Sequence, residues 1–85
     1  MKIYKAKIDI LPHKELLDPQ GKTVAKNMQH LDIQGVLDVR IGKHIEMQFE
    51  AQSEAAAKEL VENSCKKLLT NMITETFTYS LSEQS

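Results

Sequence analysis

The chain has 85 residues and a mass of 9.7 kDa, so we expect a single domain over residues 1–85 and no second one. Eleven basic and 12 acidic residues leave a net charge of −1, which argues against a protein that holds nucleic acid or anionic lipid by charge alone. With 41% hydrophobic residues the chain should fold, but a domain this small hides only about 60% of its unfolded surface. We therefore expect an oligomer, in which partner surfaces add burial.

The cysteine content and the N-terminal segment indicate the compartment. Cys65 is the only cysteine, which excludes an intrachain disulfide and favours a reducing environment. Charged side chains at Lys5, Lys7 and Asp9 interrupt any apolar stretch of a signal peptide. No run approaches the roughly 18 apolar residues of a membrane span. We expect a soluble, cytoplasmic protein.

The first third of the chain predicts a strand followed by a helix. Apolar and polar residues alternate from Lys2 to Leu11, which is typical of a strand with one wet face, and Pro12 should end it. Asp18 supplies an N-cap side chain and Pro19 a preset φ, so a helix should begin there. Its apolar stripe consists of Val24, Ala25, Met28 and Leu31. Gly35 is predicted to mark its exit.

The middle of the chain predicts a β-hairpin. Two strand-like runs, 36–41 and 44–51, are separated only by Gly42 and Lys43, a pair suited to a tight turn. In the second run the inward-facing residues are expected to be Ile45, Met47, Phe49 and Ala51.

The last third predicts a second helix and a final strand. Ser53 can cap the helix, and Asn71 is a plausible stop. Its buried face is expected to contain Ala57, Leu60, Val61, Ser64, Leu68 and Leu69. The final strand should run over 73–81, followed by a frayed tail at 82–85. Glu75 falls on the apolar side of this strand, either at an edge or register break or in an interface.

The resulting order, β-α-β-β-α-β, predicts an α+β fold. The right-handed crossover rule favours a ferredoxin-like sandwich with two helices on one face of an antiparallel sheet. Because no helix covers the other face and part of the sheet surface is apolar, we expect oligomerisation through the sheet.

No catalytic or metal-binding constellation emerges from the residues. The histidines, His13, His30 and His44, are not clustered, whereas a zinc site needs three or four converging ligands. Cys65 falls beside a predicted buried stripe, where it is expected to behave as a small hydrophobic residue. The isolated glycines form no phosphate-binding loop. The residues therefore predict no active site of the chain's own.

Three segments stand out along the chain: L-D-P-Q-G-K at 17–22, V-R-I-G-K at 39–43 and C-K-K-L-L-T-N at 65–71. Together and in this order they resemble the PurS family, the small subunit of phosphoribosylformylglycinamidine synthase. The resemblance implies a non-catalytic subunit that bridges the synthetase subunit PurL and the glutaminase subunit PurQ in de novo purine biosynthesis. It also implies a dimer that pairs into tetramers when free. The chain itself would bind no cofactor, whereas the complex would use ATP, magnesium and glutamine-derived ammonia.

The chain departs from the family pattern at two element boundaries. Family members commonly carry Gly where this chain has Asp32, and Pro where it has Met72. Both departures concern local turn geometry.

The candidate partner-binding residues lie in the first two segments. Four of them, Asp18, Pro19, Gln20 and Gly21, open the first helix, where the alternative is simple capping. The others, Arg40, Gly42 and Lys43, are placed at the hairpin tip, where the alternative is a solvated turn.

Two other functions compete with the assembly subunit. An ACT-like regulatory domain shares the same element order and binds a small metabolite at a dimer interface. A small enzyme acting alone is disfavoured, because no pair of acid and base residues stands out.

Overall fold

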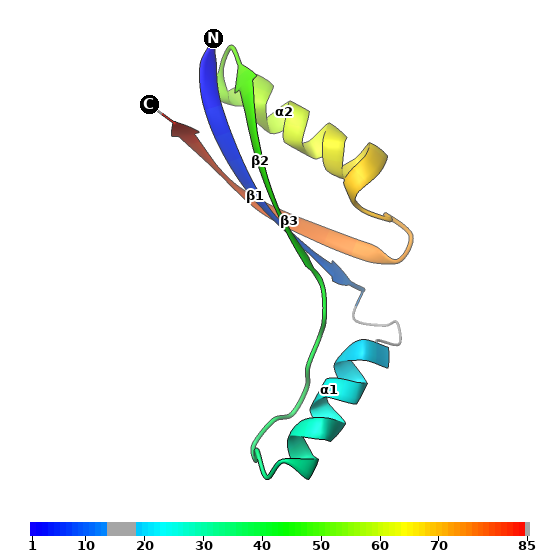
Figure 1. Cartoon of the computed structure of the whole chain (residues 1–85). Coiled ribbons are helices and arrows are strands. Elements are labelled where there is room, and N and C mark those ends of the chain that lie inside the picture. The colour runs from blue at the N-terminus through cyan, green and yellow to red at the C-terminus, as the bar shows by residue number, and fades with distance from the viewer. Residues whose placement is uncertain (14–18, 85) are drawn as a thin grey trace.

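The computed structural model describes residues 1–13 and 19–84, and within them the chain has the predicted α+β class (Figure 1). The elements in chain order are β1 (Lys2–Pro12), α1 (Pro19–His30), β2 (Lys43–Ala51), α2 (Glu54–Ser64), the π-helical turn η1 (Cys65–Leu69) and β3 (Glu75–Gln84). No helix in the described ranges is long and apolar enough to cross a membrane.

The strands form one antiparallel sheet in the order β2-β1-β3. The central strand β1 pairs with β2 from Lys2↔Ala51 to Ile10↔Lys43, and with β3 from Ile3↔Gln84 to Pro12↔Glu75. A central first strand flanked by the last two fits the order of a ferredoxin-like sheet, as predicted. The predicted placement of both helices on one face is wrong, because only α2 lies over the sheet and α1 lies beyond its end (Figure 1).

The predicted hairpin is wrong. Within the described part of the chain, residues 36–42 form no strand, and Gly42 and Lys43 lead directly into β2 instead of turning the chain. The alternation around Leu37 would need a neighbouring strand edge, but this segment runs out past the end of the sheet to α1 (Figure 1). Leu37 is accordingly 99% exposed. The alternating pattern was therefore insufficient to make a strand within one chain.

The core lies between the sheet and α2. Ala6, Ile8 and Ile10 of β1 meet Val61 and Cys65, and all five are at most 1% exposed. Burying a side chain such as Ile8 stabilises the fold by about 1.5–3 kcal/mol. This half of the molecule holds a complete, if small, core. A second cluster extends it with Tyr4, Ala51 and Ala57.

The second helix begins as predicted but ends differently. The Ser53 hydroxyl accepts a hydrogen bond from the Ala56 N–H at 3.2 Å, which confirms the N-cap. At the other end the Thr70 N–H reaches back five residues to the Cys65 carbonyl, so η1 is wider than an α-helical turn. This widening directs Leu69 to the core and leaves Leu68 83% exposed. The prediction that Leu68 is buried is wrong for that reason, and Leu60 lies at the margin with 36% exposure.

The last strand is displaced toward the C-terminus. It begins at Glu75, because residues 71–74 form a turn, and Ile73 is 86% exposed. It continues to Gln84, so the expected fraying of 82–84 is wrong. These residues pair with β1, where Ser82 lies opposite Lys5.

Helix α1 begins at Pro19, as predicted, and ends at His30, five residues before Gly35. The Ile33 N–H donates to the Met28 carbonyl at 2.9 Å, and the Asp32 N–H donates to the Gln29 carbonyl at 3.2 Å. This is a Schellman motif, in which the residue at the left-handed position is normally Gly. Asp32 occupies that position with φ +60°, so the departure from the family pattern falls where Gly is favoured. The predicted N-cap, Asp18, lies outside the described residues.

The molecule is elongated, with extents of 52 × 29 × 14 Å and a radius of gyration of 16.6 Å. A compact chain of this length would have a radius near 12 Å. The difference arises because α1 lies beyond the end of the sheet (Figure 1).

Candidate functional site

The structure brings the first two motif segments together where the sheet meets α1. An open cavity of about 310 Å³ lies there. It is lined by Pro12, Pro19, Gln20, Ile41, Gly42, Lys43 and Glu75. Pro19 and Gln20 come from the first turn of α1, whereas Gly42 and Lys43 come from the start of β2 some 20 residues later. Four of the predicted partner-binding residues, Pro19, Gln20, Gly42 and Lys43, therefore line one cavity, whereas Gly21 and Arg40 do not. The hairpin tip to which the second group was assigned does not form.

Gly42 is required by a close approach of two backbones. A Cβ added there would overlap the Ile10 carbonyl oxygen and lie 2.6 Å from Leu11 Cδ2. The carbonyl belongs to β1 and cannot move without disturbing the sheet. Gly42 therefore lets the returning chain join the sheet beside Ile10, and this contact sets the position of Lys43.

A second, mostly apolar concavity of about 550 Å³ adjoins the first on the α1 side. It is lined by Pro19, Gln20, Thr23, Val24 and Ile41. The Thr23 hydroxyl donates to the Pro19 carbonyl at 2.8 Å, so it is occupied in tying the first turn of α1. Gly21, also in this turn, is buried. The helix start is therefore a packed structural element as well as a motif.

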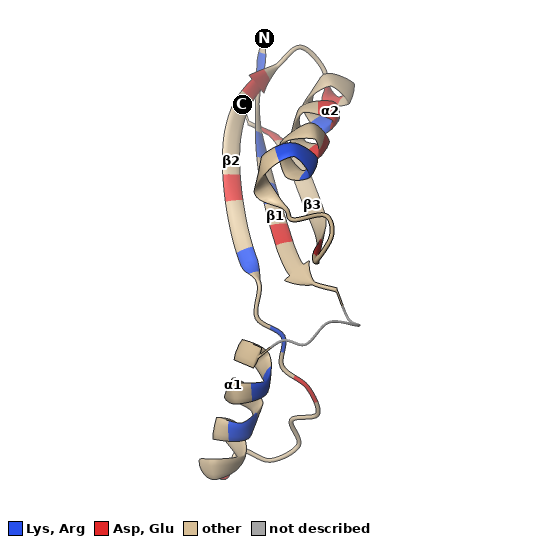
Figure 2. Cartoon of the chain, turned by 90° about the vertical axis from the view of Figure 1, so that its right-hand side faces the viewer, with Lys and Arg blue, Asp and Glu red and all other residues tan. Residues whose placement is uncertain are grey.

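The two basic motif residues differ in their surroundings. Lys43 is exposed and lines the 310 Å³ cavity. Arg40 is half-buried, and its Nη2 atom is buried without a hydrogen-bond partner in the described structure. The alternative of a solvated turn therefore does not describe Arg40. Figure 2 adds that α1 carries only basic charges, whereas α2 carries both signs.

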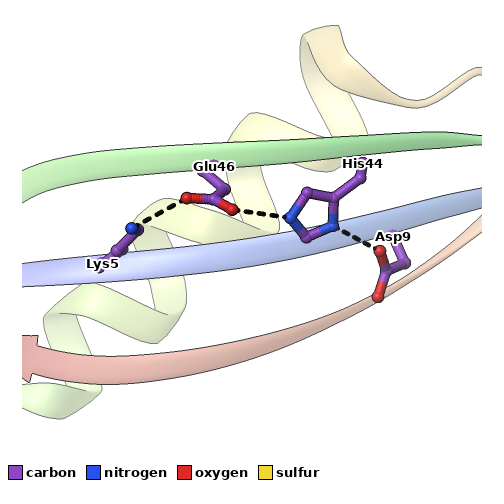
Figure 3. Close-up of polar contacts among 4 residues, drawn as sticks. All are labelled: Lys5, Asp9, His44 and Glu46. Carbon is purple, nitrogen blue, oxygen red and sulfur yellow. Dashed lines mark hydrogen bonds and ion pairs between the residues drawn. The ribbon is translucent and has the colours of Figure 1, made fainter.

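A network of four charged side chains lies on the open face of the sheet, next to this junction (Figure 3). His44 Nδ1 lies 2.7 Å from Asp9 Oδ1, and His44 Nε2 lies 3.1 Å from Glu46 Oε2. Lys5 Nζ lies 2.9 Å from Glu46 Oε1. Asp9 and His44 also line a third concavity, of about 480 Å³, together with Gly42 and Lys43.

The network shifts the protonation of two of its members. Hydrogen bonds to Asp9 and then Glu46 raise the pKa of His44 above its usual value of 6.5. Hydrogen bonds from Lys5 and then His44 lower the pKa of Glu46 to about 2. A protonated His44 donates from both ring nitrogens to carboxylates on two strands. The search for clustered histidines in the sequence did not reveal this arrangement, because Asp9 and His44 become neighbours only through the β1–β2 register.

The remaining candidates have structural roles. Cys65 is fully buried, as predicted, and burial raises the pKa of its thiol, with a further contribution from Glu62. Such a thiol is poorly nucleophilic. Glu75 accepts a hydrogen bond from the Asn71 N–H at 2.8 Å where β3 begins, and β3 is an edge strand, which agrees with the first alternative, an edge position. The interface alternative stays a prediction. Among the described residues no three His, Cys, Asp or Glu side chains converge as metal ligands.

Comparison with known proteins gives a consistent result. Residues 5–83 match the family model PurS, described as phosphoribosylformylglycinamidine (FGAM) synthase. The chain is 36% identical to phosphoribosylformylglycinamidine synthase subunit PurS of Bacillus subtilis over 95% of both chains. Its fold superimposes on PurS of Thermus thermophilus with a TM-score of 0.85, 32% identity and coverage of 98% and 99%. A chain in the structure of PurLQS from Thermotoga maritima gives a TM-score of 0.84, 30% identity and coverage of 99% and 100%.

Proposed function

The chain belongs to the PurS family and is a subunit of FGAM synthase, and from this premise we propose that it bridges PurL and PurQ in the assembled enzyme. The observation that carries the proposal is the match along the whole chain to a component of PurLQS from Thermotoga maritima. The complex would convert formylglycinamide ribonucleotide to the amidine with ATP, magnesium and ammonia from glutamine. In this proposal the chemistry takes place on the other two subunits, in the cytoplasm.

The surface around the 310 Å³ cavity is proposed as one docking site for these subunits. It combines exposed Lys43 and Gln20 with rigid backbone at Gly42. Asp18, Pro19, Gly21 and Arg40 belong to the same family motifs and complete the proposed partner-binding set. The ACT-like alternative has no observation in its favour, because the family match covers residues 5–83.

We also propose that two copies associate through the sheet. Helix α2 covers the centre of the apolar face, but Ile45, Met47 and Phe49 of the edge strand β2 are only partly buried. The stripe predicted on α1 is likewise incompletely covered, and Leu31 is 72% exposed. Both surfaces are apolar and open to water in a single chain, so each could cover the other in a dimer. A second copy would bury both.

Copurification tests the assembly function. Tagged chain should recruit PurL and PurQ and restore glutamine-dependent amidine synthesis to the mixture. Lys43→Ala should slow association with the large subunit and reduce its salt dependence, as removal of a charge at an interface rim does. Lys58→Ala is a matched control, because Lys58 is exposed on α2 and pairs only with Glu54 among the described residues. Failure of the wild-type chain to bind either subunit would contradict the assembly function.

Light scattering tests the self-association. Leu31→Asp should dissociate the oligomer, because it places a charge in the apolar stripe. Gln34→Asp introduces the same charge at an exposed polar position nearby and should leave the mass unchanged. Equal behaviour of the two variants would show that α1 lies outside the self-interface.

A further inference from the structure

The turn between α2 and β3 exposes three apolar side chains within six residues. Leu68 is 83% exposed, Met72 is 46% exposed and Ile73 is 86% exposed. We refer to this group, Leu68, Met72 and Ile73, as the apolar turn. Single exposed apolar residues are ordinary, but a group at one corner of a small domain marks an interaction surface.

The turn is held in this conformation by hydrogen bonds at both ends. The Ile73 N–H donates to the Asn71 side-chain oxygen at 3.1 Å, and the Glu75 N–H donates to the Asn71 carbonyl at 2.7 Å. The Asn71 N–H donates to Glu75 Oε1 at 2.8 Å, and the His13 N–H of the chain after β1 donates to the Thr74 carbonyl at 2.9 Å. The backbone is therefore fixed by its own contacts, which reduces the entropy lost when a partner binds.

The π-helical turn η1 also contributes to the exposure of Leu68. Its extra residue per turn places Leu69 against the core and Leu68 in water. An α-helical continuation would have followed the predicted stripe and directed Leu68 inward. Wide turns of this kind are frequent at functional sites in helices.

Charge defines the chemistry that a partner must have. Lys66 and Lys67 are exposed immediately before Leu68, and neither forms an ion pair within the described structure. The complementary surface is an apolar pocket with an acidic rim.

Two observations argue against a second copy as the occupant. The turn leads into β3, which is the sheet edge opposite to β2, where the self-interface is proposed. In addition, a two-fold contact between two such turns would bring four lysine side chains together. We propose that the apolar turn inserts into an apolar pocket with an acidic rim on another subunit of the synthase. This inference rests on the assembly function proposed above.

The test is a binding measurement on the double variant Met72→Ser with Ile73→Ser. Its affinity for PurL or PurQ should fall tenfold or more, since side chains that anchor in a pocket dominate interface energetics. The self-associated mass should not change. The thermal midpoint should fall only slightly, because Ile73 is 86% exposed and Met72, at 46% exposure, is the only one of the two that is substantially covered. Ile3→Ser is the matched control, as Ile3 is 41% exposed at the far end of the sheet, and it should bind normally.

Two further variants examine how the turn acts. Asn71→Ala removes the hydrogen bond to the Ile73 N–H and should weaken binding less than the double variant, mainly by loosening the turn. Lys66→Ala with Lys67→Ala should slow association and flatten its salt dependence.

Three results would overturn the inference. The first is unchanged affinity of the double variant for both subunits while the wild type binds them. The second is loss of self-association in that variant, which would make a second copy the occupant. The third is cosedimentation of the wild type, but not the variant, with phosphatidylserine vesicles. Absence of wild-type binding to either subunit would instead refute the assembly function itself.

Discussion

Two regions of the molecule are amphipathic: the sheet with α2, and the segment of residues 19–42 that contains α1, which we call the excursion. They differ in what their apolar side chains contact. In the first region Ala6, Ile8 and Val61 are excluded from water. In the second the only buried residue of α1 is Gly21, and Leu31 and Leu37 are mostly exposed. The first region is therefore stabilised by its own chain, whereas the second has an apolar surface that the described residues leave open to water. In a subunit of an assembly, the sheet with α2 would then form the stable core, and the segment with α1 would supply the surface for association.

The largest expected effect contrasts core and excursion directly. Ile8→Ala should lower the free energy of unfolding by about 2–5 kcal/mol, because it removes methyl groups from a packed core. Leu31→Ala should change it by no more than about 0.5 kcal/mol in the dissociated chain, since the side chain is mostly in water. Urea unfolding at low protein concentration measures both. Similar losses of unfolding free energy in the two variants would mean that α1 is part of the core, and the two regions would then not differ in this respect.

The junction between the two regions provides the second prediction. Gly42→Ala should destabilise the chain by about 1–3 kcal/mol, because its Cβ overlaps the backbone of β1. Gly35 is the control within the excursion, with φ +88° and no atom within 4 Å of an added Cβ. There Gly35→Asn should be tolerated better than Gly42→Asn, because Asn accepts positive φ but cannot avoid a backbone clash. A lower thermal midpoint for Gly35→Asn than for Gly42→Asn would contradict the close approach of the Gly42 and Ile10 backbones.

A smaller effect is expected at the end of α1. Asp32→Gly should stabilise the chain by up to about 1 kcal/mol, because Asp32 has φ +60° in a position where Gly has no Cβ penalty. Thermal unfolding measures this, with Asp38→Gly in the same segment as the control. If Asp32→Gly lowered the thermal midpoint, the Asp32 side chain would have to make a contact that stabilises the fold by more than its positive φ destabilises it.

The smallest effect concerns pH and the network on the open sheet face. The pKa of His44 is raised in the folded state, so its stabilising contribution is complete below pH 6.5 and is lost as pH rises through the raised value. Glu46, with its pKa lowered to about 2, contributes above pH 4.5 and loses its contribution as pH falls toward 2. The stability difference between wild type and His44→Gln should therefore be larger at pH 6 than at pH 9. A difference independent of pH would show that the network does not form in solution.

Local features of the sheet region could be predicted from sequence because each depends on near neighbours. The alternation in β1 specified a strand with one buried face, and Ser53 specified the start of α2. The resemblance carried by the motifs at 17–22 and 39–43 identified residues that line one cavity. The Asp9–His44 pair could not be found in this way, because two residues 35 positions apart become neighbours only when the strand register is known.

Sequence alone therefore determined the α+β class, the family, the polarity of each strand face and the start of both helices, since these follow from periodicity, capping and motifs within short segments. The tertiary structure decided where the excursion goes, whether 36–42 becomes a strand, and which of Leu68 and Leu69 reaches the core. The reason is that a strand exists only where a second edge accepts its hydrogen bonds, and a helix buries its stripe only where a surface lies opposite. Among residues 1–13 and 19–84, α2 meets such a surface, and α1 and residues 36–42 do not.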